Sequence, residues 1–249
     1  MKTNWPFQMH SYPIGHRNNP TILRSSTFTG SIEILAVNTL DEATPMAKEL
    51  YYNSTADLGG RGDGEDPYTR PSFSVTQRAV RLIWTLVWIF LYRPTPRPAH
   101  FWRAWLLRLF GAKLGPGCRF YPASKVWAPW NLVCEDRVVV SDGTEVYNQA
   151  PIHLGSHAIL SQGSYLCAST HDPNSPAFPL LAYPMEIGAY AWIAARAIVG
   201  PRVDVGEGAV LGLASVATHS LEPWSIYVGV PAKKVKDRNR FLAPRSERG

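Results

Sequence analysis

Aliphatic residues recur at every sixth position through the second half of the chain, and each is followed directly by a small residue. The unbroken series is Ile187, Ile193, Val199, Val205 and Leu211. Strand alternation with a period of two would not place Gly or Ala at every sixth position. A coil that turns three corners in each rung stacks equivalent positions, so aliphatic side chains fill the interior and corners require small residues. The period therefore predicts a parallel β-helix.

The same pattern extends toward the N-terminus with less regularity. The nearest earlier members of the series are Leu154, Leu160 and Leu166. Further upstream we expect the six-residue step to continue through Phe120, Val126, Leu132 and Val138. Larger side chains stand there where small ones are expected, so the first rungs should be less regular than the later ones. We assign the β-helix to residues 113–238.

The period fails between Leu166 and Ile187. Their separation of 21 residues is not a multiple of six, so we expect residues 172–185 to leave the coil as a loop. Insertions in repeat proteins often form the binding face. His171 stands where this loop departs, on the regular scaffold and beside the excursion. A neutral imidazole accepts a proton near neutral pH, which makes His171 a candidate for catalysis.

Two apolar segments precede the repeat. Residues 74–92 contain neither Pro nor Gly and are apolar on nearly every side from residue 82 onward, and a second such segment covers about 101–110. Both segments predict short helices flanked by arginine and tryptophan. The apolar part of the first, about 16 Å long, is too short to span a bilayer. The helices either lie in the interface of an anionic membrane or pack as a cap on the β-helix.

Charge is concentrated in this helical segment. Residues 71–112 contain six arginines and no acidic residue, while the formal charge of the whole chain is +6. Such a distribution indicates an anionic partner, and we expect it not to be nucleic acid. The polar, turn-rich residues 1–70 predict a flexible extension, and residues 239–249 a C-terminal tail.

The location of the protein is indicated by two weaker signals. The three cysteines form no paired motif, and the N-terminus has no apolar run behind a basic start. Both observations favour a reduced cytoplasmic protein, with peripheral contact to the inner membrane if the helices bind lipid.

Several motifs resemble the hexapeptide-repeat acyltransferases, in particular the colanic acid biosynthesis acetyltransferase type. The residues that carry the resemblance are 105–112, 128–132, 147–148, 166–172 and 229–232. The resemblance covers about 74–238 and implies a left-handed parallel β-helix that assembles as a homotrimer. It also implies an O-acetyltransferase of exopolysaccharide biosynthesis, which moves an acetyl group from acetyl-CoA to a sugar hydroxyl in clefts between subunits, without a metal.

The resemblance further implies roles for individual residues. His171 is the implied general base, which removes the proton of the acceptor hydroxyl and returns it to the CoA thiolate. Asn148 either donates a hydrogen bond to the acceptor or the oxyanion, or caps a turn. Asp172 either orients His171, binds sugar hydroxyls, or only starts a turn. The implied cofactor-binding residues are Trp192, Ala195, Gly212, Leu213, Ala214, Thr218, Lys233 and Lys234. Related enzymes often carry a phosphate-contacting lysine after the threonine that corresponds to Thr218, and this chain has His219 there instead.

Two other functions compete with this one. A γ-class carbonic anhydrase has the same fold and holds zinc with three histidines. The candidates here are His153, His157 and His171, and their spacings of 4 and 14 residues do not fit that family's pattern. Alternatively, the β-helix could serve only as a scaffold or binding subunit. The histidine next to a long loop favours the enzyme.

Overall fold

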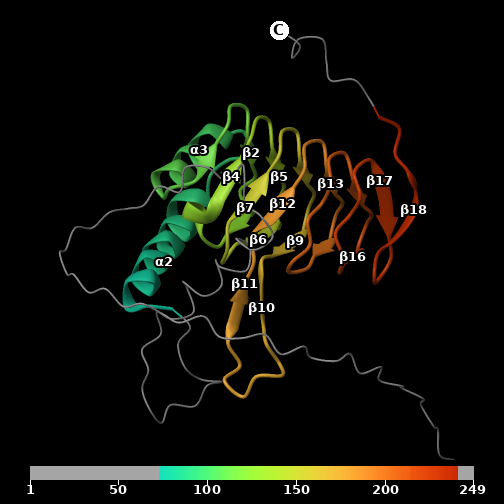
Figure 1. The fold of residues 1–249 in the computed structure, drawn as a ribbon. Coiled ribbons are helices and arrows are strands. Elements are labelled where there is room, and N and C mark those ends of the chain that lie inside the picture. Colours follow the sequence, from blue (N-terminus) through green and yellow to red (C-terminus); the bar gives the residue numbers. More distant parts are fainter. Residues whose placement is uncertain (1–72, 241–249) are drawn as a thin grey trace, which may run out of the picture. The chain divides into compact units, whose positions relative to one another are not determined.

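The computed structural model describes residues 73–240, in which helices come first and a β-helix follows (Figure 1). Residues 1–72 and 241–249 lie outside the described residues. The prediction of a flexible extension over 1–70 falls there, as does most of the predicted tail 239–249, so both stay predictions.

Three parallel sheets form the faces of the coil within the described residues. The first contains β1 (Lys113–Leu114), β4 (Leu132–Cys134), β7 (Ile152–Leu154) and β12 (Met185–Ile187). The second contains β2 (Arg119–Phe120), β5 (Val139–Val140), β8 (Ile159–Leu160), β13 (Trp192–Ile193), β15 (Val210–Leu211), β17 (Ser225–Val228) and β18 (Lys233–Asp237). The third contains β3 (Lys125–Val126), β6 (Glu145–Tyr147), β9 (Tyr165–Cys167), β14 (Ile198–Val199) and β16 (Val216–Ala217). The chain visits the sheets in rotation, which confirms the parallel β-helix. Among the strands of these three sheets, only β18 runs antiparallel to its neighbour, β17.

The aliphatic residues of the six-residue series fill the interior as predicted. Ile193, for example, stacks between Leu160 and Leu211 in the neighbouring strands, and all three are fully buried. The small residues that follow have a steric cause. A Cβ atom added at Gly188 would lie 2.5 Å from the backbone nitrogen of Glu207 in the next turn. The period therefore reflects close contact between successive turns.

The first two turns are longer than predicted. Phe120 pairs with Val140, 20 residues later, whereas the turn after the loop takes 18 residues. The expectation that Leu132 and Val138 keep the six-residue step was wrong, because Cys134 and Val140 occupy the aligned positions. Leu132 and Val138 are buried nonetheless, so hydrophobicity alone did not distinguish the registers. The additional residues lie at the corner between the third and the first sheet, where a 3₁₀ turn, η2, occupies Pro129–Asn131.

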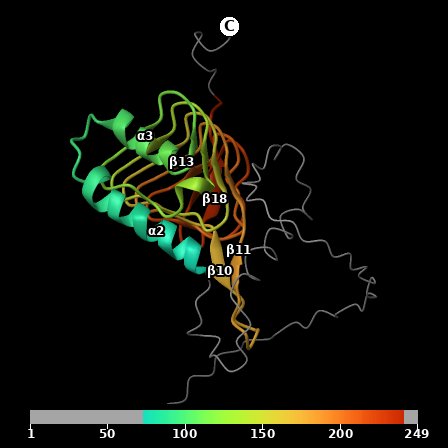
Figure 2. The same cartoon turned by 90° about the vertical axis from the view of Figure 1, so that its left-hand side faces the viewer.

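The interruption of the period forms a β-hairpin, which we call the arm (residues 169–182). Its strands β10 (Ser169–His171) and β11 (Leu180–Ala182) pair antiparallel, with His171 opposite Leu180. The arm projects away from the coil in two perpendicular views (Figures 1 and 2). The excursion thus begins before residue 172, and Met185 is already back in the coil. The placement of His171 on the regular scaffold was wrong, because the antiparallel pairing carries it into the arm.

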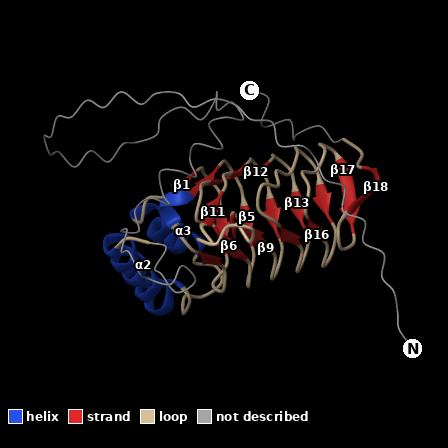
Figure 3. Ribbon diagram, turned by 60° about the horizontal axis from the view of Figure 1, so that its bottom comes forward, coloured by secondary structure: helices blue, strands red, loops and turns tan. Residues whose placement is uncertain are grey.

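The two predicted helices pack on the first turn of the coil (Figure 3). Helix α2 (Val75–Val87) continues into a π-helical turn, η1 (Trp88–Tyr92), and α3 (His100–Leu109) follows. The buried indole of Trp84 donates from Nε1 to the carbonyl oxygen of Val126 at 2.8 Å. This packing confirms that the helices cap the β-helix. No helix within residues 73–240 is long and apolar enough to cross a membrane.

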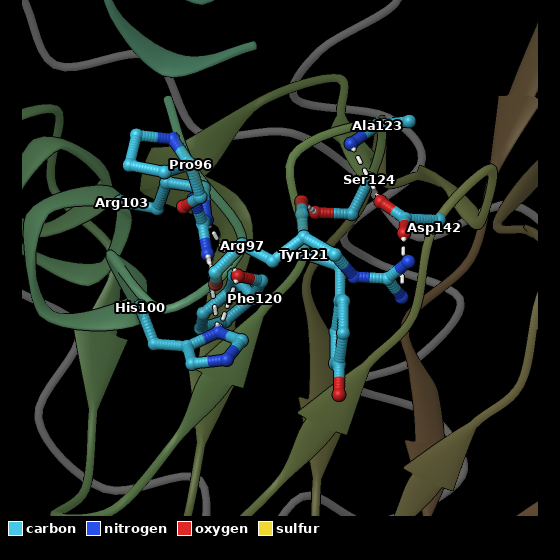
Figure 4. Close-up of polar contacts among 9 residues, drawn as sticks. All are labelled: Pro96, Arg97, His100, Arg103, Phe120, Tyr121, Ala123, Ser124 and Asp142. Atoms are coloured by element: carbon cyan, nitrogen blue, oxygen red, sulfur yellow. Dashed lines mark hydrogen bonds and ion pairs between the residues drawn. The ribbon is translucent and has the colours of Figure 1, made fainter. Parts of the chain in front are cut away.

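Arg103 joins the helices to the coil through its buried side chain (Figure 4). Its guanidinium donates to the carbonyl oxygen of Phe120 at 2.6 Å and to three acceptors within residues 95–97. These hydrogen bonds offset the cost of removing a cation from water. One of the six arginines of the helical segment is therefore structural and is not exposed to an anionic partner.

Candidate active site

His171 is oriented in the arm by Phe178. The two rings stack with centroids 4.4 Å apart and planes within 9°, and Nδ1 of His171 lies 3.0 Å from the carbonyl oxygen of Phe178. A carbonyl oxygen only accepts, so this hydrogen bond assigns the proton to Nδ1. Nε2 then carries the lone pair. An imidazole held in one tautomer, with the other nitrogen as acceptor, is what general-base catalysis requires.

Asp172 starts the turn of the arm. Its Oδ1 accepts a hydrogen bond from the backbone nitrogen of Asn174 at 2.9 Å, and its own backbone nitrogen donates to Pro179 at 3.2 Å. This is the side-chain-to-backbone arrangement of an Asx turn. Of the three roles expected for Asp172, the turn role matches these contacts, while Phe178 performs the orientation of His171.

Asn148 is fully buried at the corner between the third and first sheets. Its Oδ1 accepts from the backbone nitrogen of Ala128 at 2.9 Å, and its Nδ2 donates to the carbonyl oxygen of Ala128 at 2.7 Å. Both polar atoms of the side-chain amide therefore bind the preceding turn. This matches the second of the two expected roles, in which Asn148 caps a turn. An acceptor or oxyanion contact by Asn148 would require this pair of hydrogen bonds to open.

An aromatic row on the third sheet was not predicted. Trp127 contacts Tyr147 edge to face at 5.5 Å between centroids, and Tyr147 stacks on Tyr165 at 6.3 Å. The arm departs beside this row, because the backbone nitrogen of Ala168 donates to the carbonyl of Tyr147. Burial raises the pKa of Tyr147, so its hydroxyl stays protonated at neutral pH. Trp127 and Tyr147 are 20 residues apart, and this spacing is the signal that knowledge of the true turn length would have revealed.

The implied cofactor residues lie on the turns after the arm, and the structure brings several of them together. The carbonyl of Ala195 accepts from the backbone nitrogen of Ala214 at 3.0 Å, and Leu213 beside it is exposed. Trp192 is partly exposed and donates from Nε1 to Ser161 at 2.8 Å. The corner is formed by Ala214 with a φ of 52°, in the left-handed region that ends such tight turns.

Two other implied cofactor residues, Gly212 and Thr218, make different contacts with neighbouring residues of the protein. A Cβ atom at Gly212 would lie 2.7 Å from the side chain of Val228, so Gly212 is required by packing as well. The hydroxyl of Thr218 lies 3.0 Å from Nδ1 of His219, so the two exposed side chains form one polar pair. His219 thus takes part in the local contacts of the predicted groove.

The two lysines on β18 are not equivalent. Lys234 Nζ lies 2.8 Å from a carboxylate oxygen of Glu222 and 2.9 Å from one of Asp237. The hydrogen bonds that Lys234 donates to Asp237, and to a smaller extent to Glu222, raise the pKa of Lys234. Lys233 is exposed one residue earlier, opposite Val228. A phosphate would therefore compete with two carboxylates at Lys234.

The histidines considered for zinc do not converge. His153 pairs with Glu186 through Nδ1 at 2.7 Å, while His157 stacks on Tyr190 at 4.8 Å between centroids. His171 lies apart from both in the arm. Over residues 73–240, no three His, Cys, Asp or Glu side chains form a group that could hold a metal ion.

The fold is similar to that of solved hexapeptide-repeat acetyltransferases. One from Vibrio cholerae superposes with a TM-score of 0.61 at 18% sequence identity, over 67% of this chain and 95% of that chain. A galactoside acetyltransferase in complex with coenzyme A superposes with a TM-score of 0.63 at 16% identity, over 68% of this chain and 86% of that chain. At these identities the likeness shows the fold, which is the fold of the hexapeptide-repeat acetyltransferases.

Sequence comparison narrows this class. The chain is 36% identical over 156 residues to the putative colanic acid biosynthesis acetyltransferase WcaF of Escherichia coli, covering 63% of this chain and 86% of that protein. It therefore belongs to the family of the colanic acid biosynthesis acetyltransferases and is an acetyltransferase. A probable acetyltransferase of Mycobacterium tuberculosis is 29% identical over 108 residues, covering 41% of this chain and 36% of that protein. No model of a known protein family matches the chain.

Proposed function

We propose that this protein transfers an acetyl group from acetyl-CoA to a sugar hydroxyl in exopolysaccharide biosynthesis. The relationship to WcaF supports the pathway, and solved neighbours with bound acetyl coenzyme A or coenzyme A support the donor. The observation that carries the mechanism is the hydrogen bond between Nδ1 of His171 and the carbonyl of Phe178, because it presents Nε2 as a base.

In the proposed reaction, Nε2 of His171 accepts the proton of the sugar hydroxyl as that oxygen attacks the thioester carbonyl. The imidazolium is stabilised because Nδ1–H already donates to Phe178, and a charged donor strengthens this hydrogen bond. The tetrahedral oxyanion then collapses, and the bond between carbon and sulfur breaks. The proton on Nε2 passes to the CoA thiolate, which leaves an acetylated sugar, free CoA and neutral His171.

The donor in this proposal lies along the turns after the arm. Ala195, Gly212 and Ala214 let backbone groups approach the pantetheine, because their own side chains are small or absent. We assign the first phosphate contact to Lys233, since Lys234 is already paired with two carboxylates. Trp192, Leu213 and Thr218 supply the side chains of the groove.

The acceptor in this proposal lies beside the aromatic row at the base of the arm. Aromatic faces stack on the apolar faces of sugar rings, and Tyr147 offers a hydroxyl that accepts from Gln149 Nε2 at 2.5 Å. The arm projects from its own coil (Figure 2), which favours a site completed by a neighbouring subunit. The homotrimer and the cytoplasmic location are parts of the proposal.

The test is acetyl-CoA turnover with a panel of soluble glycans, for the parent protein and for His171→Ala. The substitution should lower kcat by about 10²- to 10⁴-fold, the usual contribution of a general base. The apparent affinity for acetyl-CoA and the free energy of unfolding should stay the same. His153→Gln is the matched control, because it changes a histidine of the coil outside the proposed site. Unchanged turnover in His171→Ala would exclude the general-base role, and glycan binding by the parent without turnover would favour a scaffold.

A further inference from the structure

The outward side of the two helices is apolar. Its members, which we call the outer face, are Leu82, Ile83, Leu86, Phe90, Phe101 and Trp105. Phe90 is 68% exposed and Phe101 is 77% exposed. A helix that caps a domain normally presents polar residues to water. Contiguous apolar patches on a protein surface are typical of interaction sites.

The inner side of the same helices already fulfils the packing role. Trp84 and Tyr92 are buried against the coil, and Tyr92 bonds through its hydroxyl to Ser124 at 2.7 Å. The cap therefore accounts for one side of α2 and η1 and leaves the outer face unexplained. The outer face continues onto α3, because Trp102 stacks on Trp105 at 5.0 Å and donates from Nε1 to the carbonyl of Leu91.

Arginine side chains lie at the ends of the helices that carry the outer face. Arg103 is buried and Arg97 forms an ion pair with Asp142 at 3.2 Å, but Arg78, Arg93 and Arg108 are exposed at the ends of the helices. Residues 71–112 hold no acidic side chain. An apolar helix face with an arginine rim and tryptophan at its edge is complementary to an anionic lipid surface.

We propose that the outer face docks the protein on a membrane that contains anionic lipid, with α2 and η1 lying in the plane of the interface. The 18 helical residues from Val75 to Tyr92 give a rod of about 27 Å along the surface. Contact between two copies of the outer face is disfavoured, because it would bring the arginine rims together without acids to pair them. The docking is independent of the proposed acetyl transfer.

The experiment is co-sedimentation of the full chain with vesicles of phosphatidylcholine alone or of phosphatidylcholine with phosphatidylglycerol. The parent should sediment with the anionic vesicles and weakly with the neutral ones, and added salt should reduce binding. The double substitution Ile83→Ser/Phe90→Ser should abolish binding. The matched control Ile159→Ser/Val235→Ser removes two exposed apolar side chains from the coil and should bind like the parent. Arg78→Gln and Arg93→Gln should each lower affinity for anionic vesicles about fivefold.

Three results would overturn the docking proposal. The first is a parent that stays in the supernatant with both kinds of vesicle. The second is a double variant that binds like its parent. The third is a double variant whose oligomeric state, measured by light scattering, changes while vesicle binding does not, since the outer face would then join copies of the chain. Acetyl transfer to a soluble glycan, measured on the same variants, should be unchanged, so loss of docking and loss of catalysis are separate outcomes.

Discussion

The turns from Ile187 to Leu211 and the arm that precedes them are stabilised in different ways. In the turns, every position of the six-residue series is buried against its equivalents above and below. In the arm, only the end residues Ser169 and Ala182 are buried. The coil is therefore stabilised by many repeated contacts, whereas the arm makes few contacts, and those with Phe178 orient His171. A substitution in the coil should therefore affect folding, and one in the arm should affect chemistry.

The strongest test of this difference is Ile193→Ala. Ile193 is fully buried between Leu160 and Leu211, and truncation of such a side chain costs about 2–5 kcal/mol of unfolding free energy. Chemical denaturation measures the loss. The folded fraction should retain the kcat of the parent, and a stability within about 0.5 kcal/mol of the parent would contradict the account of the coil.

A smaller effect is expected from Phe178→Ala in the arm, and it should fall on kcat instead of on stability. The backbone carbonyl that holds Nδ1 of His171 remains, but the ring that fixes the imidazole plane is lost. We expect kcat to fall about 10-fold or more, since small misplacements of a catalytic group are costly, with KM and unfolding free energy unchanged. Phe178→Tyr keeps the stacking and should restore kcat. Equal loss in both variants would show that stacking does not position His171.

The smallest effect concerns the first two turns, where Cys118 and Cys134 stand in place of aliphatic residues. A hydrogen bond from Cys134 lowers the pKa of Cys118 to about 7, below the ordinary value of a cysteine thiol. Because the unfolded chain then binds more protons between pH 7 and 9, stability should rise with pH across this window, by on the order of 1 kcal/mol or less after solvent screening. Cys118→Ser should remove this rise in denaturation curves, while Ile193→Ala should keep it. A rise that persists in Cys118→Ser would assign it to another group.

The fold was predictable because its pattern is local and repeated. Ile187, Ile193 and Val199 each report the same environment, so their agreement identifies the coil without knowledge of any long-range contact. The register of the first turns was not predictable in this way. Val138 and Val140 are both buried, and only pairing with Leu160 in the next turn distinguishes them.

The candidate site was predictable only in part. The interrupted period directed attention to His171, but its tautomer depends on Phe178, seven residues away across the turn of the arm. Asn148 carried a matching motif, yet its amide is bound to Ala128 in the preceding turn. Which of two polar roles a side chain takes depends on the partner that the fold places within reach.

By itself, the sequence determined that this protein is a β-helix with an apolar, arginine-rich helical segment and one interruption, because periodicity and charge are properties of the chain alone. Only the tertiary structure decided that His171 lies within the arm, and that Trp127 and Tyr147 form a row beside its base. It also decided that each helix has one buried and one exposed apolar side. These facts depend on contacts between residues far apart in the chain, whose free energies no local pattern encodes.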